Sequence, residues 1–227
     1  MVGRRRCCLV VLMDEEDEVI ACVRLEGGKV VVYPLSRGEA HRLNVSHIVV
    51  RVLGFSREGL LLVQRRSKFK RSNPGKYTDT ASGHISPDEA TGADGLFRAA
   101  ERELLEEVGV RGKLSFFTGP IYDGEDNEVN YVFLALLEGA PMFSDEVDGE
   151  RSGFRTPEEL RAMLSAESFV PVAKALWLHF LERYPRKDDV RSLASSFVEG
   201  WGRDELAMKL GEELRSLLIQ IERARLK

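Results

Sequence analysis

The chain has 227 residues, of which 43% are hydrophobic and 31% charged, as is ordinary for a globular protein with one extended domain or two small ones. Its 33 basic and 37 acidic residues give a formal net charge of −4, so there is no basic field to recruit nucleic acid. No apolar run approaches the ~20 residues of a membrane-spanning helix. We therefore expect neither nucleic acid nor a membrane as a partner.

The N-terminal sequence MVGRRRCCLVVLMDEEDE has two features of a signal peptide, since three arginines precede an apolar run. That run, residues 7–13, is at the lower limit for a signal core and meets acidic residues instead of a small-residue cleavage site. A β-strand is therefore the preferred interpretation. The three cysteines, Cys7, Cys8 and Cys22, are odd in number and lack the spacing of a metal site. They indicate reduced thiols and a cytoplasmic location.

Strands are expected first along the chain and helices later. From Thr156 the pattern becomes helical, because Thr156 and Glu159 form a capping box with proline at the first helical position. Further helices are predicted at 170–184 and 204–227. Runs of β-branched and apolar residues between turn residues predict strands at 18–25, 29–35, 47–55, 59–66, 78–84, 113–122 and 128–137.

This order favours an α+β fold in which helices cover both faces of a mixed sheet, an α/β/α sandwich. Three parts are expected: an N-terminal β-rich extension at 1–44, a central domain at 45–185 and a C-terminal helical tail at 186–227. The tail has an apolar face that packs either on its own core, which is preferred, or in a homodimer interface. That face comprises Leu206, Leu210, Leu214, Leu217 and Ile221.

The stretch RELLEEVGV, residues 102–110, places Glu103, Glu106 and Glu107 on neighbouring turns of one helix. Like charges at this spacing repel by a few tenths of a kcal/mol per pair, so they need a counterion or a clamp. Arg102 lies four residues before Glu106 and can clamp it. Three carboxylates together suit a hard cation such as Mg²⁺ or Mn²⁺. The alternative is a solvated acidic face. Phe97, Ala100, Leu104 and Val108 form the buried stripe of the helix, and Gly109 ends it.

Upstream, the loop SGHISPDE supplies Gly83 and Glu89. Together with residues 102–110 these two resemble the Nudix box, a glycine, five residues, a glutamate, seven residues and then R-E-(apolar)-x-E-E-x-G-(apolar). One departure is that twelve residues separate Glu89 from Arg102. An alternative register takes Asp94 as the acid and replaces the glycine by Asp88. The Gly83–Glu89 register is preferred, because only glycine lets backbone carbonyls approach a metal closely.

The resemblance implies a Nudix hydrolase, which cleaves a diphosphate linked to another group with Mg²⁺ or Mn²⁺. In that case Glu103 and Glu107 are the principal metal ligands, and Glu106 and the carbonyl of Ser82 contribute. Arg102 holds Glu106 and the loop acid in place. A general base must still accept a proton from water. Glu106 is one candidate, and an acid from a downstream loop, Glu128 or Glu146, is another.

The substrate phosphates also need cations, and the densest basic stretch before the motif begins with Arg65 and Arg66. Arginine forks suit phosphate oxygens, so these two are the preferred substrate contacts. The alternative is a basic surface loop without a ligand. Lys68, Lys70, Arg71 and Lys76 complete the stretch.

Two other functions stay open. The runs TDTASGH and EDNEVNYVF look like those of type I isopentenyl diphosphate isomerases, which share the Nudix fold and bind a metal through histidines and two loop acids. His47, His84, Asp126 and Glu128 stand at comparable positions, but Ser82 replaces the cysteine that moves protons in the isomerases. A binding module without turnover is the third possibility. The complete set of motif glutamates favours the hydrolase.

Overall fold

The structure is a computed structural model that describes residues 15–225. The strand expected at 7–13, with Cys7 and Cys8, lies outside the described residues. Cys22 is described, and it is a buried free thiol. Within residues 15–225, no helix is both long enough and apolar enough to cross a bilayer.

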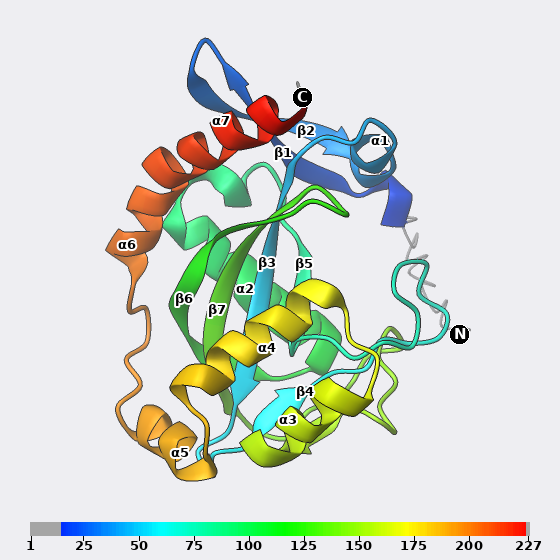
Figure 1. Cartoon of the computed structure of the whole chain (residues 1–227), viewed down its shortest axis with the longest axis vertical. Coiled ribbons are helices and arrows are strands. Elements are labelled where there is room, and N and C mark those ends of the chain that lie inside the picture. Colours follow the sequence, from blue (N-terminus) through cyan, green and yellow to red (C-terminus); the bar gives the residue numbers. More distant parts are fainter. Residues whose placement is uncertain (1–14, 226–227) are drawn as a thin grey trace, which may run out of the picture.

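A mixed sheet of eight strands forms the centre of the molecule (Figure 1). Its central pair, β3 (His47–Phe55) and β7 (Glu128–Glu138), is parallel, with Val50 opposite Tyr131. Every residue of β3 is buried, as expected of parallel strands that are covered on both faces. The other strands are β1 (Val19–Glu26), β2 (Lys29–Ser36), β4 (Leu61–Val63), β5 (Ala81–His84), β6 (Arg111–Asp123) and β8 (Gly153–Arg155).

Helices cover both faces of this sheet, which confirms the predicted α/β/α arrangement (Figure 1). One face packs on α2 (Ala93–Val108) and on the C-terminal helices, and the other packs on α3 (Pro157–Ala166), α4 (Pro171–Arg183) and α5 (Lys187–Ser195). The remaining helical elements are α1 (Arg37–Arg42), α6 (Arg203–Met208), the π turn Lys209–Glu213, α7 (Leu214–Arg225) and the 3₁₀ turns Glu15–Asp17 and Glu89–Thr91.

The helix of the acidic motif, α2, is built as its sequence predicts. Gly109 ends it with φ of 64°, and its amide donates to the carbonyl of Leu105 at 3.1 Å. A left-handed cap of this kind favours glycine because glycine has no Cβ. The predicted apolar stripe, Phe97, Ala100, Leu104 and Val108, is buried against the sheet.

The later helices differ in part from the sequence prediction. The capping box of Thr156 and Glu159 is present at the start of α3. Two short helices, α1 and α5, were not predicted. The strand expected at 59–66 is shorter, because only Leu61–Val63 forms β4 and Arg65 and Arg66 make isolated bridges.

The apolar face of the tail packs on the chain's own core, as preferred. Leu206, Leu214 and Ile221 are buried as predicted, whereas Leu210 and Leu217 are only half-buried and Leu218, which was not predicted, is buried. A π turn at 209–213 also interrupts the predicted helix. The division of the chain at 44/45 and 185/186 stays a prediction, and the main core contains side chains from all three parts.

Candidate functional site

A polar cavity of about 290 Å³ lies beside the acidic helix, at one end of the central strands. Acidic, imidazole and basic side chains all line it, which is the composition expected of a site for metals and phosphates. The lining includes Arg37, His41, Arg51, Arg66, Lys70, Ser82, Gly83, His84, Arg102, Glu103, Glu106, Glu107, Asp126, Glu128 and Glu146.

Glu103 and Glu107 form the carboxylate end of this cavity. Each residue is only 7% exposed, so both carboxylates are held away from bulk water. One oxygen of Glu107, Oε2, accepts hydrogen bonds from the amide of Ser82 at 3.0 Å and from Gln64 at 3.1 Å. A Cβ on Gly83 would lie 2.1 Å from Oε1 of Glu103, so any larger residue there would displace that carboxylate.

Burial makes these two carboxylates poor anions in the absence of a cation. It raises the pKa of Glu103 to about 8 and that of Glu107 to about 7. A divalent cation would reverse this effect, since an opposite charge within a few ångströms stabilises the ionised form. Two buried carboxylates on one helix therefore fit Mg²⁺ or Mn²⁺ as ligands. Their oxygens and those of Glu106 do not, however, form a group of three within 4.8 Å of one another, which among the described residues only the histidine cluster does.

Arg102 links the carboxylates of the motif to the loop before it. Its Nη1 donates to Glu103 at 2.6 Å and to Glu106 at 3.0 Å. Its Nε donates to Glu89 at 3.1 Å, and its Nη2 donates to the carbonyl of His84 at 3.0 Å. Arg102 thus joins the end of β5 to α2 and fixes the carboxylates relative to Gly83.

The long spacing of the motif does not separate Glu89 from Arg102. The extra residues form the 3₁₀ turn Glu89–Thr91 and the first turns of α2. Glu89 also accepts from the amide of Ser86 at 2.8 Å, which holds it in the loop. Asp94, the acid of the alternative register, pairs instead with Arg203 in the tail. This geometry agrees with the Gly83–Glu89 register.

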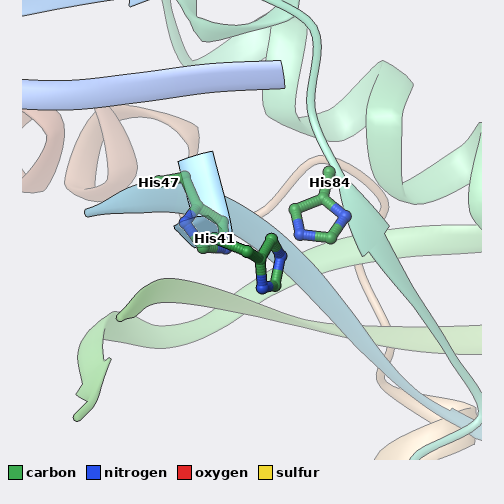
Figure 2. Close-up of side chains that lie close together, drawn as sticks. All are labelled: His41, His47 and His84. Atoms are coloured by element: carbon green, nitrogen blue, oxygen red, sulfur yellow. The ribbon is translucent and has the colours of Figure 1, made fainter. Parts of the chain in front are cut away.

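Three histidines form a second group, called here the histidine end (Figure 2). His41 and His84 line the cavity, and His47 lies behind its lining, beside them. His41 comes from α1, His47 from the start of β3 and His84 from the end of β5. One ring nitrogen of each lies within 4.8 Å of those of the other two. Nε2 of His47 and Nε2 of His84 are buried without any hydrogen-bond partner among residues 15–225. Two buried ring nitrogens without a hydrogen-bond donor or acceptor in the described part of the chain, in a cluster this close, fit the ligand atoms of a metal ion.

The protonation state of this cluster also suits a metal. Nδ1 of His47 lies 3.0 Å from the carbonyl of Val45, so that nitrogen carries the proton and Nε2 keeps its lone pair. Burial lowers the pKa of His47 and lowers that of His84 well below its usual value. Neutral imidazole is the form that binds a metal.

Two acids, Asp126 in the β6–β7 turn and Glu128 at the start of β7, line the cavity beside these histidines. Arg51 in β3 donates to Glu128 at 2.8 Å, to Asp79 at 2.8 Å and to Asn130 at 2.6 Å. Burial alone would raise the pKa of Glu128, but Arg51 outweighs it and holds that pKa below its usual range. Glu128 is therefore an anion beside the histidines.

Two residues on which the histidine end depends, His41 and Arg51, were not predicted from the sequence. His41 belongs to a short helix that the pattern did not predict. Arg51 carried a signal, because it is the single charge within the buried strand HIVVRVLGF and charges are seldom buried without a role.

The predicted substrate cations divide between the cavity and the surface around it. Arg66 and Lys70 line the cavity, and Lys70 pairs with Glu146 at 3.0 Å. Arg65 is not among the lining residues. Its guanidinium pairs with Asp148 at 3.3 Å and lies over the ring of Tyr77. Adjacent residues of an extended chain point to opposite sides, which separates Arg65 from Arg66.

Comparisons with known proteins agree with this fold. An uncharacterised Nudix hydrolase of Listeria monocytogenes is 32% identical over 139 residues, covering 60% of this chain and 78% of that protein. An isopentenyl-diphosphate Delta-isomerase of Streptomyces griseus is 34% identical over 122 residues, covering 50% of this chain and 59% of the isomerase. The crystal structure of DR0079 from Deinococcus radiodurans superimposes with a TM-score of 0.55 at 20% identity, covering 71% of this chain and 98% of that one.

The profile of the NUDIX domain matches residues 44–176, which is more than half of the chain. This range contains the central strands β3 and β7, the acidic helix α2 and both carboxylates of the cavity. The chain therefore belongs to the Nudix hydrolase superfamily.

Proposed function

We propose that the chain hydrolyses a diphosphate linkage, in a nucleoside diphosphate joined to another group or in a related compound, with Mg²⁺ or Mn²⁺ bound at Glu103 and Glu107. The observation that carries the proposal is the burial of both carboxylates in one cavity, against Gly83. Glu106 and the carbonyl of Ser82 complete the proposed ligand set. When bound, the cation neutralises the phosphoryl oxygens and makes water a better nucleophile at neutral pH.

The residues around these carboxylates have distinct proposed roles. Arg102 positions Glu103 and Glu106, because it donates to both carboxylates. Arg66 and Lys70 line the cavity, so we propose them as the phosphate contacts. Arg65 is the weaker candidate, since it does not line the cavity.

Among the three acids considered as general base, we propose Glu106. It lines the cavity on the same helix as the proposed metal ligands, and its side chain is 58% exposed, so it can take a proton from water and release it to solvent although Arg102 also donates to it. Glu128 is tied to Arg51 and has a lowered pKa, which makes it a weak base. Glu146 also lines the cavity, but it lies outside the motif helix and pairs with Lys70, a proposed phosphate contact.

A panel of diphosphate compounds, assayed with Mg²⁺, with Mn²⁺ and with a chelator, tests this function. Hydrolysis of at least one compound is expected with either metal and not with the chelator. The Glu107→Gln variant serves as the control, because it removes a proposed ligand but keeps the size of the side chain. Inertia towards the whole panel would instead support a non-catalytic binding module.

The histidine end supports a second candidate. We propose that His41, His47 and His84 bind a second divalent cation, with Asp126 and Glu128 as further ligands. Imidazole nitrogens favour Zn²⁺, Mn²⁺, Fe²⁺ or Co²⁺ over Mg²⁺, so the two ends should hold different metals. Because the Streptomyces relative is named an isomerase, allylic diphosphate isomerisation is the alternative activity. Ser82 argues against it, since a serine hydroxyl is a poor acid at neutral pH.

Allylic isomerisation is tested on the same samples, loaded with Mg²⁺ and with Mn²⁺. Isomerisation without hydrolysis would replace the hydrolase by the alternative. We propose that the hydrolase acts on small diphosphates in a cytoplasmic setting. We also propose that it works as a monomer, because the apolar face of its tail packs on the chain's own core. Sedimentation would test the homodimer that the sequence left open.

A further inference from the structure

Two asparagines with left-handed backbones stand at the turns that carry the histidine end. Asn44 has φ of 55° and lies three residues after His41 and three before His47. Asn127 has φ of 57° and lies between Asp126 and Glu128. Asparagine tolerates this conformation better than most residues, but it still costs energy and persists only where the surroundings hold it.

The two turns are joined directly. The side-chain amide of Asn127 donates to Oδ1 of Asn44 at 2.5 Å. The amide of His47 donates to the carbonyl of Asn127 at 3.2 Å, and the hydroxyl of Tyr122 donates to Oδ1 of Asn127 at 2.6 Å. Asn127 is only 4% exposed, so these bonds are shielded from water. The turn that carries the histidines and the turn that carries the acids are therefore linked through one asparagine pair.

Arg225, in the last turn of α7, contacts both of these turns. Nη2 of Arg225 donates to the carbonyl of Asn44 at 3.2 Å and also to Oδ1 of Asn127. The helix that carries Arg225 is itself fixed, because Leu214, Leu218 and Ile221 are buried in the main core. Arg225 thus connects a rigid helix to both turns at once, although it lies about 100 residues or more from either of them in the sequence.

We propose that Arg225 is a positioning residue, which holds the turns of Asn44 and Asn127 so that the histidines and acids converge on one metal. This inference rests on the second metal site proposed above. Metal affinity depends on ligands held within about 0.5 Å of their bound positions. Without the guanidinium, the two strained turns would separate more easily, and the ligands on them would bind less tightly.

Arg215 provides a matched control on the same helix. Its Nε donates to the carbonyl of Gly28 at 2.6 Å, which also ties α7 to the body of the protein, but at the β1–β2 hairpin. If Arg225 acted only by holding the tail in place, Arg215→Met would have the same effect as Arg225→Met. If it positions ligands, the two variants will differ in metal affinity and not in thermal stability.

The test measures Co²⁺ binding to the full chain, by its visible absorption and by calorimetry, beside thermal unfolding without metal. Wild type is expected to bind one Co²⁺ that His84→Ala abolishes. Arg225→Met is expected to bind it about tenfold more weakly, and Arg215→Met within about twofold of wild type. Asn127→Gly removes the acceptor of Arg225 and the direct bond to Asn44 but keeps the backbone conformation, so it should weaken binding at least as much as Arg225→Met. The double variant should lose little more than Asn127→Gly alone, because Arg225 acts largely through Asn127.

The possible outcomes distinguish failure of the Arg225 proposal from failure of the second metal site on which it rests. If wild type binds no Co²⁺ that depends on His84, the second metal site is wrong and the role of Arg225 falls with it. If the Co²⁺ site exists but Arg225→Met binds as wild type does, only the positioning role is overturned. Equal losses in Arg225→Met and Arg215→Met, or additive losses in the Arg225→Met and Asn127→Gly pair, would likewise assign Arg225 a general structural role.

Discussion

The two ends of the cavity are built in different ways. The carboxylate end comes from one helix and the strand before it, and a single arginine, Arg102, joins them. The histidine end draws on α1, β3, β5 and the β6–β7 turn, and it is held by Arg51 from within and by Arg225 from the tail. A short contiguous motif therefore encodes one end, whereas the other exists only when distant segments have folded together.

The chemistry of the two ends differs in the same way. Burial raises the pKa of Glu103 and Glu107, and it lowers that of His47 and His84. In both cases the neutral form is favoured without a metal. Oxygen ligands suit Mg²⁺ and imidazoles suit a transition metal, so the two ends should be separable by mutation.

The largest expected effect is on hydrolysis, and it comes from changing the carboxylate end alone. Glu103→Gln removes the charge of a proposed Mg²⁺ ligand, and loss of several kcal/mol of charge stabilisation lowers hydrolysis by about 10³-fold. Co²⁺ binding at the histidines should stay within about threefold of wild type, because Glu103 is not one of the proposed ligands there. Steady-state hydrolysis and Co²⁺ titration on one preparation provide the measurement. Loss of both properties would show that the two ends are one coupled site.

The opposite result, loss of Co²⁺ binding with Mg²⁺ binding kept, is expected when the histidine end is changed. His84→Ala removes one of the orphaned buried nitrogens, so Co²⁺ affinity should fall at least about 100-fold. The carbonyl of His84, which accepts from Arg102, is kept by this substitution. Calorimetric titration with Mg²⁺ should then give an affinity close to that of wild type. Unchanged Co²⁺ binding would refute the histidine site and leave the carboxylate proposal intact.

This difference also explains what could be predicted from the sequence. Glu103, Glu106 and Glu107 lie within five residues of one another, so helical periodicity alone places them together. His47 and His84 were linked only through a family resemblance, and His41 was missed because α1 is six residues long and has little periodicity. Alternation along a strand predicts that only one of Arg65 and Arg66 faces a given cavity, but it does not say which.

The tail shows the same limit. Three of the five leucine and isoleucine positions predicted for its apolar face are buried, but Leu218 is buried in place of its neighbour Leu217. Which of two neighbouring leucines faces the core depends on how the helix is rotated against the sheet, and no spacing rule gives that rotation. The contact of Arg225 with Asn44 and Asn127 is likewise invisible in the sequence, because it depends on where a distant helix ends. Local motifs are therefore predictable from the sequence, and contacts between distant elements need the structure.

A smaller effect is expected where the two ends adjoin. Gly83→Ala would place a Cβ against the carboxylate of Glu103, displacing a proposed Mg²⁺ ligand by roughly 1 Å and lowering hydrolysis roughly 50-fold. Co²⁺ binding at the neighbouring His84 should change little, because the histidine side chain is not displaced. Gly92→Ala is the control, since a Cβ there meets nothing within 4 Å. Equal activity of the two variants would contradict the close approach of Gly83 to the metal ligands.

The smallest expected effect is on the stability of the metal-free chain as a function of pH. The carboxylates and the histidines change the free energy of unfolding in opposite directions as pH rises. The folded-state pKa of Glu103, about 8, lies above the unfolded value of 4.5, so the folded chain holds more protons between these limits and its stability falls as pH rises. The histidines have lowered pKa values, so their contribution rises with pH up to about 6.5 and is constant above it. Between pH 6.5 and 8 only the carboxylate contribution changes, by roughly 2 kcal/mol, which corresponds to a fall of about 5 °C in Tm.

Glu103→Gln or saturating Mg²⁺ should remove most of this fall, whereas His84→Ala should leave it in place. Thermal unfolding in a chelator across this range tests the difference, and a Tm that rises from pH 6.5 to 8 would show that the buried carboxylates are already ionised without a metal.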